Sequence, residues 1–260
     1  MNNIAICVNN ENKNENAKET IDAIKNAGFK NVFIQWYNED FDLSQEEQLK
    51  YINELRLNVI FAHLGYQNLN VIWEPGIQGA LYEKRYINDL NECKKHEIEL
   101  VIIHPVSGTT VPAPSQVGLG RFKAIVEHAK KLGIKIAFEN TKVKDHLEFL
   151  LNNIQDEHVG TCIDTGHYHC HWNDEVNIDL IKNRVFAVHI HDNDKSYDQH
   201  LLPFDGTIDW SKTVKVLNDC NYERPITLES CYSECYNIPI QDFYNKAYDN
   251  ANKLVRMINR

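Results

Sequence analysis

The chain has 260 residues, which is long enough to bury a large core and suits a single domain over residues 1–260. Hydrophobic residues make up 43% and charged residues 25%, as in globular proteins, and the longest apolar runs are too short to cross a bilayer. The net charge of −10 disfavours a nucleic-acid partner, because proteins that grip a phosphate backbone usually present a basic face.

The N-terminal stretch MNNIAICVNNENK holds the first predicted strand and nothing that resembles an export signal. No basic region precedes its apolar run, and that run has about five residues against the roughly seven to fifteen of a signal peptide. We therefore expect a cytoplasmic protein. The seven cysteines, an odd number without any CxxC pair, argue against a disulfide framework and a thiolate zinc finger, and predict mostly free thiols.

Along the chain, short β-branched apolar runs alternate with stretches of helical periodicity, and no linker or low-complexity segment separates them. Two predicted helices end at Gly28 and Gly133, where a left-handed residue is expected. Eight strand–helix units in about 250 residues predict an α/β fold, a single closed (β/α)8 TIM barrel, better than an open doubly wound sheet. The predicted strands are residues 3–8, 30–36, 57–63, 99–104, 135–139, 159–164, 186–191 and 225–229.

Six successive predicted strands end in side chains that can bind a metal ion. TIM-barrel enzymes carry their chemistry at the carboxyl ends of the strands, so these side chains should converge on one mouth. Two ionised carboxylates about 4 Å apart repel by about 4 kcal/mol at an effective dielectric of 20, so several in one cup need a cation or protons. The strand-end residues are His63, His104, Glu139, Asp164, His189 and Glu229, and His167, Asp198 and His200 follow strand ends in the loops.

Each of these residues has an ordinary alternative when it is taken alone. A histidine at a strand end is more often a hydrogen-bonded core residue than a ligand, and Asp164 can simply cap the helix that follows it. His189 and His191 lie two apart on one strand and point to the same side. We favour His189 as the ligand, and His191 as a substrate contact, a partner that orients a ligand, or a satisfied polar residue.

Aromatic residues near the predicted mouth are candidates for the pocket wall. Tyr66 and Trp73, in the loop after the third strand, can cover a bound ligand and exclude water, and Trp36 ends the second strand. Trp210 is expected to pack rather than to bind. The loop 104–118 is rich in small polar residues and proline and suits a lid, a phosphate-contacting segment or a passive surface loop, and the stretch 142–146 suits a solvated helix start.

Several motifs together resemble the xylose-isomerase-like TIM-barrel superfamily over nearly the whole chain. It includes sugar phosphate isomerases and epimerases and the endonuclease IV type of abasic-site nuclease. The epimerase branch holds one divalent ion, often manganese, on four strand-end residues, and the resemblance carries these roles to Glu139, Asp164, His189 and Glu229. It implies that the two glutamates move the proton. The motifs are FAHLGYQNLN, IIHP, AFENT, CIDTGH, HIHDND, DQHLLPFDGTIDW and TLES.

The endonuclease IV branch binds three zinc ions through nine ligands, and all nine positions are filled here. The resemblance therefore implies between one and three divalent ions, Mn²⁺ or Zn²⁺. These nine positions are His63, His104, Glu139, Asp164, His167, His189, Asp198, His200 and Glu229.

The acidic net charge and the lack of basic βα loops favour a sugar or sugar phosphate isomerase or epimerase. In that reaction one glutamate removes a carbon-bound proton and the other returns it through an enediolate. The segment NTKVKDHLEF also departs from the glycine-rich continuation expected of the nuclease branch. The alternatives are a zinc-dependent abasic-site nuclease, which Asp198 and His200 favour, and a metal-binding barrel of other activity. A homodimer or a monomer is expected from the resemblance.

Overall fold

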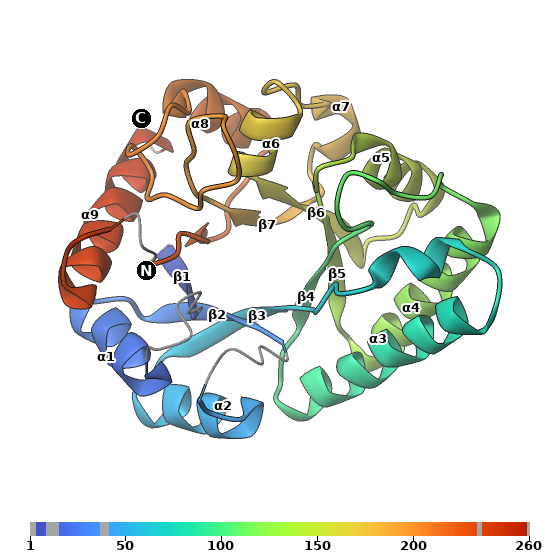
Figure 1. Ribbon diagram of the computed structural model, residues 1–260, viewed down its shortest axis with the longest axis horizontal. Helices are drawn as coiled ribbons and strands as arrows, with labels where there is room; N and C mark the ends of the chain where they lie inside the picture. Colours follow the sequence, from blue (N-terminus) through green and yellow to red (C-terminus); the bar gives the residue numbers. More distant parts are fainter. Residues whose placement is uncertain (1–3, 9–15, 37–41, 233–235, 259–260) are drawn as a thin grey trace.

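Eight parallel strands form a ring inside a layer of helices, as Figure 1 shows for the computed structural model. The structure describes residues 4–8, 16–36, 42–232 and 236–258. All eight predicted strands are present, and their ends differ from the predicted ones by at most two residues. The strands are β1 (Ile4–Val8), β2 (Asn31–Gln35), β3 (Asn58–His63), β4 (Leu100–Ile103), β5 (Lys135–Glu139), β6 (Val159–Asp164), β7 (Val185–His189) and β8 (Ile226–Leu228).

The strands pair in the order β7-β6-β5-β4-β3-β2-β1-β8, and every pair is parallel. The ring closes just beyond β7, where Ile190 bridges Leu228 of β8. The Ile190 amide donates to the Thr227 carbonyl at 2.9 Å, and the Glu229 amide donates to the Ile190 carbonyl at 3.0 Å. The predicted (β/α)8 barrel is therefore confirmed, and the carboxyl ends of its strands meet at one mouth.

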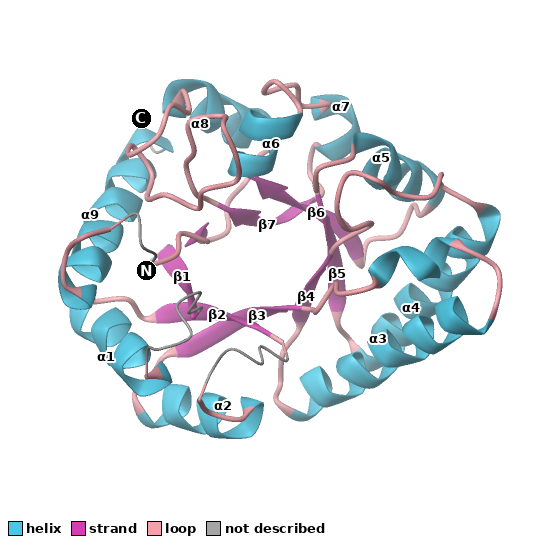
Figure 2. Ribbon diagram, in the orientation of Figure 1, coloured by secondary structure: helices cyan, strands magenta, loops and turns pink. Residues whose placement is uncertain are grey.

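The helices lie outside the ring of strands (Figure 2). Helices α1 and α4 end at the two predicted glycines, Gly28 with φ 107° and Gly133 with φ 72°, and both are left-handed. Helix α9 packs against α1, β1 and β8, so it covers the seam between the first and last strands. The helices are α1 (Ala17–Ala27), α2 (Gln45–Glu54), the 3₁₀ helix η1 (Leu69–Trp73), α3 (Ile77–Lys95), α4 (Gln116–Leu132), α5 (Lys144–Asn153), α6 (Thr165–His171), α7 (Ile178–Ile181), α8 (Trp210–Asp219) and α9 (Ile240–Ile258).

Apolar side chains fill the barrel below the mouth and fix which residues point into it. Side chains two residues apart on a strand share a face, so the residue two positions after an interior one also faces inward. Five predicted ligands follow an interior residue in this way. The pairs are Phe61 and His63, Ile102 and His104, Ala137 and Glu139, Cys162 and Asp164, and Ala187 and His189.

Among the described residues, no helix combines the length and the apolarity that crossing a lipid bilayer requires. Six cysteines lie in the described ranges, and five of them are buried, as expected. The buried thiols are Cys7, Cys93, Cys162, Cys220 and Cys231.

Candidate metal centre

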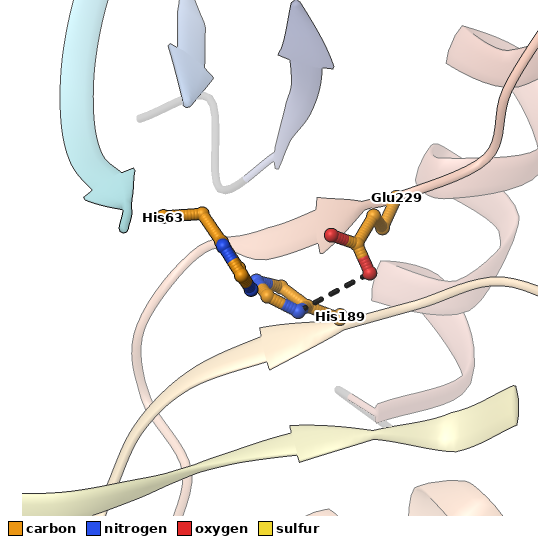
Figure 3. Close-up of side chains that lie close together, drawn as sticks. All are labelled: His63, His189 and Glu229. Carbon is orange, nitrogen blue, oxygen red and sulfur yellow. Dashed lines mark ion pairs between the residues drawn. The ribbon is translucent and has the colours of Figure 1, made fainter. Parts of the chain in front are cut away.

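Four side chains from four neighbouring strands converge at the mouth of the barrel: Glu139, Asp164, His189 and Glu229, which we name the central set. Each offers one ligand atom, and these atoms lie within 4.8 Å of one another. Nδ1 of His189 is 3.0 Å from Oε2 of Glu139 and 3.2 Å from Oε2 of Glu229. Figure 3 shows the His189 ring directed at Glu229, with His63 beside it. Atoms about 2.1 Å from a common ion lie roughly 3–3.5 Å apart, and both distances from His189 to the glutamates fall in this range.

The surroundings of His189 fit a bound cation. The ring is fully buried and stacks on Phe33, with centroids 5.2 Å apart and planes 10° apart. Within the described ranges its Nε2 has no hydrogen-bond partner, and its Nδ1 faces the two glutamates without a well-aligned hydrogen bond. A buried polar atom without a partner costs about 1–3 kcal/mol, and a cation would satisfy one of these nitrogens.

The two glutamates of the central set differ in their preferred charge. Burial raises the pKa of Glu229 well above its usual range, and the nearby charge of Glu139 adds to this. Burial also acts to raise the pKa of Glu139, but the imidazoles of His189 and His104 hold it well below its usual range. Without a cation, burial and the nearby charge of Glu139 therefore keep a proton on Glu229, and a divalent ion can take that proton's place.

Three further histidines, His63, His167 and His200, orient their rings as metal ligands do. In each ring Nδ1 faces a backbone carbonyl, which can only accept, so Nδ1 carries a proton, and the neutral ring would present the lone pair of Nε2 to an ion. Such a hydrogen bond fixes the tautomer and the direction of a ligating histidine. The acceptors are the carbonyls of Leu64 at 3.1 Å, Asn140 at 2.8 Å and Glu229 at 2.8 Å.

His63 and His104 extend the central set toward β3 and β4. Their Nε2 atoms lie 3.1 Å and 3.4 Å from Oε2 of Glu139. Burial lowers the pKa of His104 to about 4, so its ring is neutral at neutral pH, as a ligand must be. Tyr66 stacks on His104, with centroids 4.1 Å apart and planes 12° apart, and closes this side of the mouth.

On the other side, Asp198 lies between His167 and His200. Its Oδ2 is 3.1 Å from Nε2 of His167 and 3.5 Å from Nε2 of His200. Asp198 and His200 come from the loop between β7 and α8 rather than from a strand end. The nine residues that the sequence indicated as possible ligands therefore lie together in one cup, and their binding of metal stays a prediction.

The loop that carries Asp198 and His200 is organised by one buried carboxylate, Asp192. Its Oδ1 accepts the amides of Asn193 at 2.9 Å and Ile208 at 3.1 Å. Its Oδ2 accepts the amide of Phe204 at 3.0 Å and Nε1 of Trp210 at 3.1 Å. Trp210 is buried, so it packs as expected and also helps to hold the loop.

A cavity of about 260 Å³ opens above this cup. Its size suits a small ligand. It is lined by Gln35, His63, Tyr66, His104, Val106, Ser107, Gly108, Glu139, Thr141, Lys142, His167, Asp198, His200 and Glu229.

Of the four side chains predicted to contact a substrate, one lines the cavity and three do not. Tyr66 lines the cavity, but Trp36, Trp73 and His191 do not. Trp73 is buried and donates from Nε1 to the Pro105 carbonyl at 2.8 Å, and Trp36 is buried as well. Contact of these three side chains with a substrate stays a prediction.

Gln35, Thr141 and Lys142 line the cavity and were not singled out from the sequence. Gln35 is the last residue of β2, one position before Trp36. Lys142 belongs to the stretch interpreted as a solvated helix start, and it also lines the cavity, three positions after Glu139. The rule that βα loops carry the chemistry would have included all three. Part of the loop 104–118, Val106 to Gly108, also reaches the cavity.

A family model described as xylose isomerase-like TIM barrel matches residues 21–256. The protein y4fM of Sinorhizobium fredii is 30% identical over 145 residues, which cover 53% of this chain and 46% of y4fM. The chain thus spans about half the length of that relative. A probable endonuclease 4 of Mycoplasma mycoides subsp. mycoides is 23% identical over 190 residues, 63% of this chain and 66% of the relative.

Solved structures share the fold at low sequence identity. A D-tagatose 3-epimerase-like protein is 20% identical, with a TM-score of 0.77, over 98% of both chains. The IolI protein with a bound zinc atom is 16% identical, with a TM-score of 0.73, over 98% of both chains. At these identities the likeness establishes the architecture alone.

Proposed function

The chain belongs to the xylose isomerase-like TIM barrel family, and on that premise we propose that it is a divalent-metal-dependent isomerase or epimerase of a sugar or sugar phosphate. The central set carries the proposal. Two buried glutamates, Glu139 from β5 and Glu229 next to β8, reach the same imidazole nitrogen at 3.0 Å and 3.2 Å. The epimerase-like and zinc-containing solved neighbours support it.

The two glutamates are suited to move one proton between two faces of a sugar carbon. One carboxylate removes the proton from the carbon next to the carbonyl, and the electron pair moves onto the carbonyl oxygen to give an enediolate. The other carboxyl group returns a proton to the opposite face. A divalent ion held by the central set supplies the Lewis acidity that makes such a carbon acid reactive. The buried rings of Phe33 and Phe61 beneath His189 keep water from below.

Lys142 bears on the class of substrate. It is the single lysine or arginine among the described residues that line the cavity. The acidic residues there are Glu139, Asp198 and Glu229. A phosphate on the sugar would be drawn to the Lys142 side of the mouth and repelled by the carboxylates, so ketose phosphates are the first substrates to test.

Deuterium exchange tests the proposal. The Mn²⁺-loaded and Zn²⁺-loaded proteins are incubated in D₂O with a panel of ketoses and ketose phosphates, and the recovered sugars are analysed by NMR and mass spectrometry. We expect deuterium at a carbon next to the carbonyl of one sugar. Glu139→Gln and Glu229→Gln should each lower that rate roughly 10²–10⁴-fold, because each removes one of the two proton-transfer groups.

The exposed Glu99, before β4, gives the matched control, since Glu99→Gln makes the same chemical change far from the mouth and should leave the exchange rate unchanged. Metal content is measured for every variant. Exchange rates equal to those of the unaltered protein in both glutamate variants, at equal metal content, would contradict the mechanism.

A zinc-dependent abasic-site nuclease is the second candidate. It is favoured by His63, His104, His167, Asp198 and His200, which surround the central set at the positions that the resemblance assigns to further zinc ions. The net charge of −10 and the presence of a single lysine or arginine in the described cavity wall stand against it. Cleavage of an abasic-site duplex by the zinc-loaded protein, without deuterium exchange into any sugar, would make this the function.

A further inference from the structure

His191 is fully buried and has no part in the chemistry described above. Its Nε2 lies 3.0 Å from Oδ2 and 3.1 Å from Oδ1 of Asp164, a member of the central set. An ionised carboxylate only accepts hydrogen bonds, so Nε2–H donates to both oxygens. The second constraint on Asp164 is the His167 amide, which donates to Oδ1 at 2.6 Å. These contacts fix the plane of the Asp164 carboxylate.

The ring of His191 is held firmly in this position. Its amide donates to Oγ1 of Thr165 at 3.1 Å, and the Thr165 hydroxyl donates to its carbonyl at 2.7 Å. Gly166 lies against the ring, and a Cβ atom at Gly166 would fall 1.9 Å from Cε1 of His191. The absence of a side chain at Gly166 is therefore what allows His191 to reach Asp164.

Two other roles for His191 fit the geometry less well. It does not line the cavity, which disfavours contact with a bound substrate. Its Nδ1 lies 3.8 Å from Oδ1 of Asp198, which would suit a third ligand beside His200. However, the rings of His191 and His200 are stacked, with centroids 4.0 Å apart and planes 7° apart. A metal ion lies near the plane of each imidazole that binds it, and two stacked parallel planes have no such point in common.

We propose that His191 is a positioning residue that holds the Asp164 carboxylate in the orientation required to bind the ion of the central set. The inference rests on the metal site of the proposed function. Hydrogen-bond partners of ligating groups typically change metal affinity by 10–100-fold when they are removed. His191 should therefore act on metal affinity without being a ligand.

Three substitutions separate the positioning role from the others. In His191→Gln the amide nitrogen can occupy the place of Nε2 and donate to Asp164. In His191→Asn the amide nitrogen occupies the place of Nδ1, and His191→Leu fills the space without a donor. We expect His191→Gln to keep the Zn²⁺ dissociation constant within about threefold, and His191→Asn and His191→Leu to raise it by about 10–100-fold.

The measurements are Zn²⁺ affinity by competition with a chelator, metal stoichiometry by mass spectrometry, and the visible absorption of the Co²⁺-loaded protein, which reports coordination geometry. Turnover is not needed, so the substrate can remain unidentified. The Co²⁺ spectrum should change in His191→Asn and be preserved in His191→Gln.

Gly166→Ala gives an independent test, because it should push the His191 ring off Asp164 and weaken Zn²⁺ binding with His191 itself unchanged. Gly120→Ala is its matched control. Gly120 also lies in a helix, α4, and a Cβ atom there would meet nothing within 4 Å. It should leave the affinity unchanged.

Each remaining outcome overturns the inference in a distinct way. Unchanged affinity in His191→Leu would make His191 a packing residue. Loss of one bound metal per chain in all three His191 variants, with the remaining affinity intact, would make it a ligand. If the unaltered protein binds neither Zn²⁺ nor Co²⁺, both this inference and the proposed function are wrong. If it binds them normally and the His191 variants bind them equally well, only this inference is wrong.

Discussion

Asp89, in the middle of α3, is a buried carboxylate with one cation nearby, Nε of Arg85 at 3.8 Å from its Oδ2. Burial raises the pKa of Asp89 to about 6. A carboxyl group whose pKa is higher in the folded state stabilises the fold below its unfolded pKa, near 4, and that stability is lost as the pH rises through 6. Asp89 thus opposes folding at neutral pH.

Asp89→Asn keeps the shape of the side chain and removes the charge. We expect it to increase the free energy of unfolding at pH 8 by on the order of 1–3 kcal/mol and to change it little at pH 4. Urea denaturation at the two pH values measures this. Asp249→Asn, at an exposed position of α9, is the control and should have no effect at either pH. An equal effect of Asp89→Asn at both pH values would rule out the pKa as the cause.

Prediction at the scale of single residues succeeded where strand periodicity fixes the direction of a side chain. His63 and Glu139 follow interior residues by two positions, so they had to face the mouth. Trp36 is not among the residues that line the cavity, because Gln35 is the inward position at the end of β2. The stacking of His191 on His200 was beyond prediction, since it depends on how a loop folds back.

Asp192 holds the loop from β7 to α8 in place through hydrogen bonds, much as a capping residue holds the end of a helix. Both carboxylate oxygens accept two donors each. In Asp192→Asn one oxygen becomes an NH₂ group that faces two donors, and each lost hydrogen bond to a charged group costs about 1.5–3 kcal/mol. We expect the loop to open, and trypsin to cleave after the exposed Lys195 at least tenfold faster.

Asp209→Asn is a close control for this loop. Asp209 caps α8 through Oδ1 alone, which accepts the amides of Ser211 and Lys212, and asparagine caps a helix equally well. Cleavage after Lys195 should keep its normal rate in this variant. A normal rate in Asp192→Asn as well would mean that Asp192 does not hold the loop.

The strands and the glycine-capped helix ends were predictable, because hydrophobic periodicity and helix-cap chemistry depend on residues that are neighbours in the sequence. The fold of the β7–α8 loop was not, because the donors to Asp192 lie up to 18 positions away, at Trp210. The sequence showed Asp198 and His200 as candidates, and only the loop's hydrogen bonds explain how they reach the mouth.

The barrel as a whole should gain stability from its metal. A ligand that binds the folded state alone adds about 2.7 kcal/mol at 100 times its dissociation constant, which for a chain of this size raises Tm by roughly 5–10 °C. We expect a chelator to lower the Tm of the Zn²⁺-loaded protein by this amount in a calorimetric scan. In Glu139→Gln the chelator should change Tm little. Identical scans of the unaltered protein with and without chelator would exclude a metal ion that stabilises the fold.

The whole fold was predictable because eight similar units repeat along the chain, and a closed ring is the common arrangement for that number. Closure itself rests on the contact between Ile190 and Leu228, which no local pattern marks. The number of metal ions was not predictable, since the same nine residues serve one ion or three.

The position of Glu229 beside the last strand has a consequence during protein synthesis. A nascent chain that has presented only β1 to β6 offers His63, Glu139 and Asp164 to an ion, and it lacks His189 and Glu229. His63 and Glu139 are already 76 residues apart, so little besides the finished ring holds such groups together. If the central set binds an ion as proposed, tight binding therefore has to follow translation and closure of the ring.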